Sequence, residues 1–108
     1  MTVKELSELE EFKVLTIPDP DRDIEGVYIG DLLSWVMGRA KANCAWITIM
    51  SNINVVAVST LADVSLVILA EGVTLEDEVL SAATQKGVNV LSSSLPAYET
   101  ALMLSGKV

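Results

Sequence analysis

Long uncharged stretches in the last two thirds of the chain predict the strands of a central sheet. Residues 44–50 and 64–70 are nearly continuous apolar runs, and residues 88–91 form a third, shorter run. Such runs are typical of strands that are buried on both faces of a parallel sheet. Because helical patterns separate them, their order predicts overlapping βαβ units with right-handed crossovers.

Two of the predicted helices follow the second and third of these strands. The clearer one runs over residues 75–86, with Thr74 as its N-cap, acidic residues in its first turn and Gly87 as a left-handed C-cap. The last helix, over residues 96–104, begins with a proline, which the first turn of a helix accepts. This helix places three apolar residues on one face: Tyr98, Ala101 and Leu102.

The segment 53–62 fits two structures. Its three valines favour a strand by propensity. Apolar and small residues also recur at helical spacing, and Ser51 and Asn52 precede them as cap residues. No glycine supplies the tight turn that a hairpin to the preceding strand would use. We therefore predict a helix with this apolar stripe: Ile53, Val56, Ala57, Thr60 and Leu61.

The first part of the chain adds smaller elements. Thr2 and Glu5 have the spacing of a capping box, which predicts a short N-terminal helix. A strand is expected over residues 12–17, and an extended segment over residues 26–30 leads into a helix that starts near Asp31. The prolines and aspartates between these two extended segments predict a loop.

Together these elements predict an α/β fold with a small, mainly parallel sheet, βαβ crossovers and helices packed on the sheet. We expect one domain over residues 1–108, in which an N-terminal helix and strand (1–24) precede a core of about residues 25–105. The chain is 51% apolar, which is much for a protein of 108 residues with a large surface for its volume. We therefore expect a homodimer that covers part of the apolar surface.

Charge and composition exclude several functions. The net charge of -8 would repel nucleic acids and anionic membranes. The uncharged stretch 42–62 has the length of a membrane span, but Ser51, Asn52 and Asn54 interrupt its centre, so we expect no membrane span and a cytoplasmic protein. There is no histidine and only one cysteine, Cys44, which excludes a disulfide, a zinc site and His-dependent triads. We expect no enzyme activity, no metal and no cofactor.

Small and polar residues follow the three predicted central strands. Because ligands bind beyond the carboxyl ends of parallel strands, these residues are candidates for a ligand site. The alternative is that they only cap helices and form turns. The serines suit a phosphate at a helix N-terminus, whereas Glu71 would repel it unless a cation intervened, so a nucleotide is a weakly supported ligand. The candidates are Ser51, Asn52, Glu71, Gly72, Ser92 and Ser93.

The order of elements from residue 44 onward, ending in Tyr98-Glu99-Thr100-Ala101, resembles the DRTGG domain, a module similar to the N-terminal domain of the HPr kinase/phosphorylase family. The resemblance covers about residues 25–105. Ser51-Asn52 stands where that family carries Asp-Arg, and Ala70-Glu71-Gly72 stands where it carries Thr-Gly-Gly, so the name-giving residues are largely replaced.

The resemblance implies a regulatory function, since this module accompanies enzymes or sensors. We expect a stand-alone, non-catalytic regulatory or small-ligand-sensing module that acts through a partner protein. The alternative is a protein–protein assembly adaptor with no small-molecule ligand. A small enzyme that uses Glu71 or a serine is the third hypothesis and has the least support.

Overall fold

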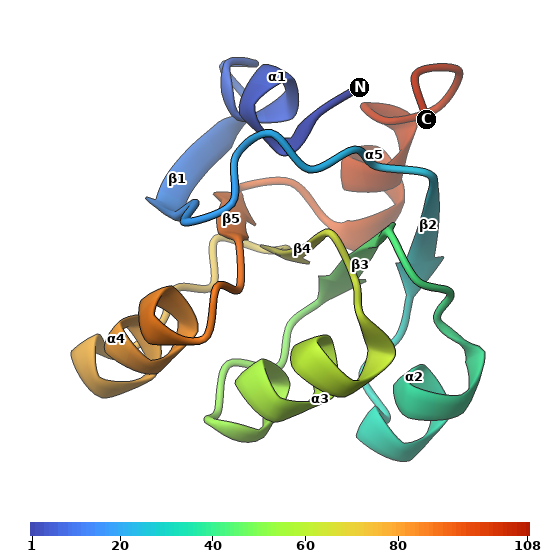
Figure 1. The fold of residues 1–108 in the computed structure, drawn as a ribbon. Coiled ribbons are helices and arrows are strands. Elements are labelled where there is room, and N and C mark those ends of the chain that lie inside the picture. Colours follow the sequence, from blue (N-terminus) through green and yellow to red (C-terminus); the bar gives the residue numbers. More distant parts are fainter.

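The computed structural model describes all residues from Met1 to Val108 (Figure 1). Helices and strands alternate along most of the chain. In chain order they are α1 (Val3–Ser7), β1 (Phe12–Thr16), β2 (Gly26–Ile29), α2 (Leu33–Arg39), β3 (Cys44–Thr48), α3 (Asn54–Ala62), β4 (Leu66–Leu69), α4 (Asp77–Gln85), β5 (Val90–Ser93) and α5 (Ala97–Leu102).

The five strands form one sheet in the order β1-β5-β4-β3-β2. Strands β2 to β5 pair in parallel, and β1 joins β5 antiparallel at one edge. Each parallel strand is followed by a helix that returns the chain to the other end of the sheet. The predicted α/β class with a mainly parallel sheet and βαβ crossovers is therefore confirmed.

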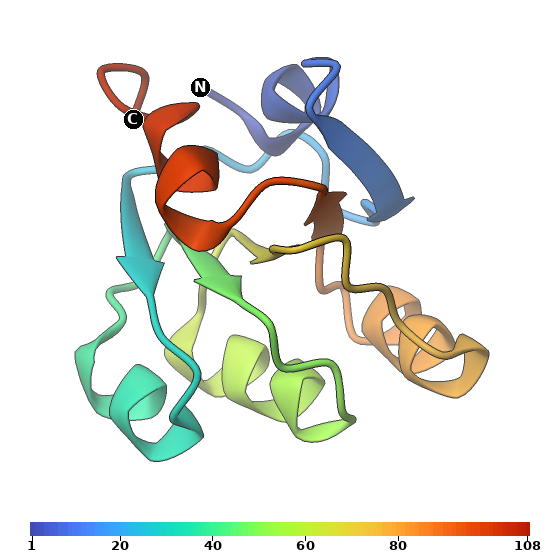
Figure 2. The ribbon, with the colours of Figure 1, turned by 180° about the vertical axis from the view of Figure 1, so that it is seen from behind.

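Helices cover the sheet on both faces (Figures 1 and 2). On one face, α2, α3 and α4 pack on a core that contains Trp46 and Val67. On the other face, α1 and α5 pack on a core that contains Ile47 and Ile68. Strands β3 and β4 are buried along their whole length, as their uncharged runs predict.

The ambiguous segment 53–62 is a helix, as predicted, but it buries a different face. The Asn52 Oδ1 accepts a hydrogen bond from the Asn54 N–H (2.9 Å) at its start. Its inward residues are Val55, Val56, Val58 and Ser59. Of the expected stripe, only Val56 is buried, whereas Ile53 and Leu61 are 47% and 70% exposed. The stripe therefore lies on the outer side of α3.

Two helix details also differ from the expectation. Helix α4 begins after Glu76, so Thr74 lies in the preceding loop and does not cap it, while Gly87 adopts the predicted left-handed conformation (φ 74°). On α5 the buried residue is Thr100, and Tyr98 and Leu102 are exposed.

The uncharged stretch 42–62 is divided between β3 and α3, and none of the helices has the length and apolar character needed to cross a membrane.

Candidate functional site

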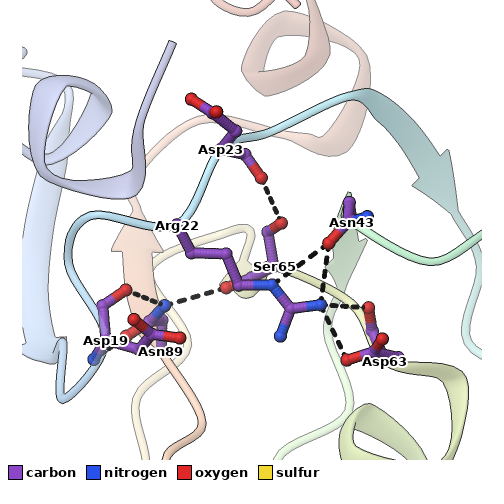
Figure 3. Close-up of polar contacts among 7 residues, drawn as sticks. All are labelled: Asp19, Arg22, Asp23, Asn43, Asp63, Ser65 and Asn89. Atoms are coloured by element: carbon purple, nitrogen blue, oxygen red, sulfur yellow. Dashed lines mark hydrogen bonds and ion pairs between the residues drawn. The ribbon is translucent and has the colours of Figure 1, made fainter.

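The amino ends of the parallel strands are covered by the loop that joins β1 to β2 (Figure 3). Asn89, which is buried just before β5, holds this loop with its side-chain amide. Its Oδ1 accepts from the Asp19 N–H (2.9 Å), and its Nδ2 donates to the carbonyl oxygens of Asp19 (2.8 Å) and Ser65 (2.9 Å). One side chain therefore ties the loop to the starts of β4 and β5.

Arg22 ties the same loop to the turns before β3 and β4 (Figure 3). Its Nη2 donates to the Asn43 Oδ1 (3.0 Å) and to the carbonyl (2.6 Å) and carboxylate (2.7 Å) of Asp63. Asn43 and Asp63 have φ angles of 66° and 57°, a left-handed conformation that Asn and Asp tolerate better than other residues. The hydrogen bonds of Arg22 and Asn89 thus occupy the amino ends of β4 and β5, whereas a hollow of about 630 Å³ lies beside the starts of β2 and β3.

The carboxyl ends of the strands border two shallow hollows instead of one pocket. The first, of about 290 Å³, is lined by Ser51, Asn52, Ile53, Glu76, Glu78 and Val79. The second, of about 310 Å³, is lined by Glu10, Glu11, Phe12, Lys13, Gly72, Thr74, Ser92 and Ser94. The predicted site residues are thus divided, with Ser51 and Asn52 on one side, Gly72 and Ser92 on the other, and Glu71 and Ser93 lining neither hollow.

The hydroxyl groups of Ser92 and Ser93 are engaged in the fold. Both residues lie inside β5, which extends two residues further than the predicted strand. Ser92 donates to the Val73 carbonyl (2.8 Å). Ser93 is fully buried, pairs with the Thr100 hydroxyl (2.9 Å) and accepts from the Leu95 N–H (3.1 Å). Ser93 therefore joins α5 to the sheet by a hydrogen bond. The next residue, Ser94, is exposed at this edge.

Glu71 and Gly72 form a left-handed turn directly after β4. Their φ angles are 61° and 72°. The Glu71 N–H donates to the Leu95 carbonyl (2.9 Å) and the Gly72 N–H donates to the Ser93 carbonyl (2.7 Å), so the turn joins the loop before α5. The resemblance to the DRTGG domain implies glycine at both positions, and glycine is the residue that adopts this backbone conformation most easily. In this chain the first of them holds a glutamate in a conformation that glycine adopts at lower cost.

Substituting Glu71→Gly is expected to raise the free energy of unfolding by about 1 kcal/mol, because the left-handed conformation disfavours a residue with a Cβ. Denaturant unfolding of both proteins measures the change. Glu99→Gly, in α5, is the matched control and is expected to destabilise by about 1 kcal/mol. If Glu71→Gly is no more stable than the unsubstituted chain, the glutamate makes contacts that offset its backbone strain.

Asp31 is a further polar residue at the carboxyl edge that the sequence prediction assigned only to a helix start. Its Oδ1 accepts from the Thr48 hydroxyl (2.7 Å) and from the Ile49 N–H (3.0 Å), so it joins the ends of β2 and β3. Helix α2 starts after Leu32, and Asp31 does not cap it. An aspartate directly after a short extended segment is the only sequence signal for this role.

Chemically, both hollows offer carboxylates and hydroxyls; the side-chain amide of Asn52 lines the first, and Lys13, the only cation, lines the second. An anionic ligand would need a cation to approach Glu76 and Glu78. Cys44 lies in β3 away from these hollows, and burial raises the pKa of its thiol, so it is protonated at neutral pH. The arrangement can bind a polar ligand through hydrogen bonds, and it contains no paired nucleophile and base.

Two comparisons relate this chain to known proteins. A comparison with curated protein sequences gives no match. The crystal structure of the CBS and DRTGG domains of the regulatory region of Clostridium perfringens pyrophosphatase, complexed with the activator diadenosine tetraphosphate, matches with a TM-score of 0.68 and 14% identity. The match covers 94% of this chain and 47% of the other, so this chain spans about half of that structure. The family model of the DRTGG domain matches residues 7–106, and the chain therefore belongs to the DRTGG domain family.

Proposed function

We propose that this protein is a non-catalytic regulatory module that binds a small polar ligand at the carboxyl edge of its sheet and acts through a partner protein. The observation that carries the proposal is that polar hollows open where the parallel strands end. Hydrogen bonds of Arg22 and Asn89 occupy the amino ends of β4 and β5, and a third hollow, of about 630 Å³, lies beside the starts of β2 and β3. Open parallel sheets bind ligands at the carboxyl ends.

The structural relative supports a nucleotide as the ligand class. It is a regulatory region in complex with diadenosine tetraphosphate, an adenine nucleotide. In this chain the replaced family residues and the carboxylates of Glu76 and Glu78 disfavour bare phosphates. We therefore propose a nucleotide that binds together with a divalent cation, whose charge offsets that of the carboxylates.

The melting temperature in the presence of nucleotides tests this function. AMP, ATP and diadenosine tetraphosphate, each with and without Mg²⁺, are added at high concentration. A ligand at 100 times its dissociation constant adds about 2.7 kcal/mol of stability, so a rise of several degrees with Mg²⁺ is expected. Asn52→Ala and Glu76→Gln are expected to reduce the rise, and Glu25→Gln, on the opposite edge, is expected to keep it. No stabilisation by any of the nucleotides would contradict the proposal.

An assembly adaptor without a small ligand is the second candidate function. It is favoured by large apolar side chains that this chain leaves exposed, among them Trp35 (53%) and Leu61 (70%). Such residues mark protein–protein contacts more often than ligand sites. In both functions we propose that the module is a homodimer. An unchanged melting temperature with all nucleotides, together with specific binding to a partner protein, would favour the adaptor.

A further inference from the structure

Helix α3 presents a second apolar side to the outside of the molecule. Ile53, Ala57 and Leu61 recur every four residues along it, opposite the valines that face the sheet. Together with Val56, Thr60, Ala82 and Lys86 they line an apolar hollow of about 400 Å³ between α3 and α4. An apolar stripe at helical spacing is typical of a packing surface, and no element of this chain covers it.

The neighbouring side of α4 carries a charge pattern with opposite signs at its two ends. Glu78, Ala82 and Lys86 also recur every four residues. At the start of the helix, Glu78 lines the hollow of about 290 Å³ at the carboxyl edge. At the end of the helix, Lys86 lines the apolar hollow. Ile53 borders both hollows, so the two stripes run side by side at the same level.

Each stripe is complementary to a copy of itself that runs in the opposite direction. On α3 a small alanine lies midway between two large apolar residues, and on α4 an alanine lies midway between an acid and a base. The spacing from Ile53 to Leu61 equals that from Glu78 to Lys86, about 12 Å along each helix. A two-fold axis that passes Ala57 and Ala82 at right angles to the helices would therefore satisfy both stripes at once.

We propose that this surface binds a second copy of the same chain, with α3 antiparallel to the partner's α3. Ile53 then meets the partner's Leu61 across the axis, and Ala57 meets its own counterpart. Glu78 of each copy lies opposite Lys86 of the other, which gives two symmetric ion pairs. The apolar contact supplies affinity and the ion pairs set the register.

Charge complementarity favours a second copy over an unrelated partner. Each copy carries a net charge of -8, which opposes association at most surfaces. Helix α3 contains no charged residue, and on the neighbouring side of α4 Glu78 and Lys86 are spaced so that an antiparallel copy pairs each of them with its opposite charge. The inference rests on the homodimer of the proposed function, and its surface includes Ile53 and Glu78, which also line one of the two proposed ligand hollows.

Sedimentation of charge-reversed variants tests the surface. Glu78→Lys alone places lysines opposite each other, and Lys86→Glu alone places glutamates opposite each other. Each variant is expected to raise the dissociation constant of the dimer by about tenfold at low ionic strength. An equimolar mixture of the two variants restores both ion pairs in a heterodimer, so its dissociation constant is expected within about threefold of the original.

Ala57→Asp adds a test of the apolar part, because it places two carboxylates together at the axis and is expected to weaken the dimer by about a hundredfold. Ala57 is exposed in the single chain, so the variant should fold, which circular dichroism checks. Leu102→Asp, on α5 across the sheet, is the control and should leave the dimer intact. If Ala57→Asp does not weaken the dimer, or if the mixture of Glu78→Lys and Lys86→Glu does not dimerise, this surface is overturned. The homodimer itself would then form through another surface. A monomeric wild-type chain at millimolar concentration overturns both, while the nucleotide assay still tests the ligand.

Discussion

Asn89→Ala is expected to lower the free energy of unfolding by about 3 kcal/mol, because the buried amide of Asn89 makes three hydrogen bonds to backbone groups. Alanine removes all three and leaves carbonyl oxygens of Asp19 and Ser65 without their donor. A buried polar group that loses its partner costs about 1–3 kcal/mol, so the cost exceeds that of the lost attraction alone. The loop across the amino ends of β4 and β5 would also lose its attachment.

Thermal and denaturant unfolding measure this effect, which corresponds to a fall of about 15 °C in melting temperature for a domain of this size. Gln85→Ala is the matched control, since it removes an exposed amide from α4 and is expected to change stability by less than about 0.5 kcal/mol. Equal stability of the two variants would show that water replaces the hydrogen bonds of Asn89 and that the loop is held elsewhere.

The strands and their parallel order were predictable because their signal is local. Uncharged runs such as that of β3 are typical of strands buried at the centre of a sheet. The capping box of Thr2 and Glu5 was predictable for the same reason, since both of its hydrogen bonds lie within four residues. The DRTGG resemblance followed from this order of elements, although the name-giving residues are largely replaced.

The buried face of α3 was not predictable, because this helix has two apolar sides. The valines of one side and the stripe of Ile53, Ala57 and Leu61 on the other give nearly the same hydrophobicity all round. Only the packing on Val67 and Trp46 decides which side faces the sheet. The same ambiguity is informative, since a helix that is apolar on both sides has a second surface to cover.

The candidate site was predictable as a location and not as a set of side chains. The carboxyl edge follows from the parallel order, but the hydroxyl of Ser93 is taken by Thr100, a partner seven residues away on another element. Asp31 depends in the same way on Thr48 in the adjacent strand. The left-handed backbone of Glu71 depends on its hydrogen bond to Leu95. Each of these contacts arises only when the sheet is assembled.

Trp46→Ala is expected to be the most destabilising of these substitutions, at about 4 kcal/mol. Trp46 lies in the middle of β3, is fully buried, and belongs to the core beneath α2 and α3. Its indole Nε1 donates to the Gly30 carbonyl (2.8 Å), so it also holds the end of β2 that leads to Asp31. Alanine would leave a cavity and an unpaired carbonyl at the same place.

Trp46→Phe separates the two contributions, because the ring is largely kept and only the indole donor is lost, at an expected cost of about 1–2 kcal/mol. This variant leaves Trp35, which is 53% exposed and stacks on Arg39, as the only tryptophan. Its fluorescence is therefore expected to move to longer wavelength, whereas the wild-type spectrum contains the contribution of a buried indole. A loss of less than 1 kcal/mol in Trp46→Ala, or an unshifted spectrum in Trp46→Phe, would contradict the burial of Trp46. In that case Trp46 would not hold the carboxyl ends of β2 and β3 together, and the contact between Asp31 and Thr48 would lose this support.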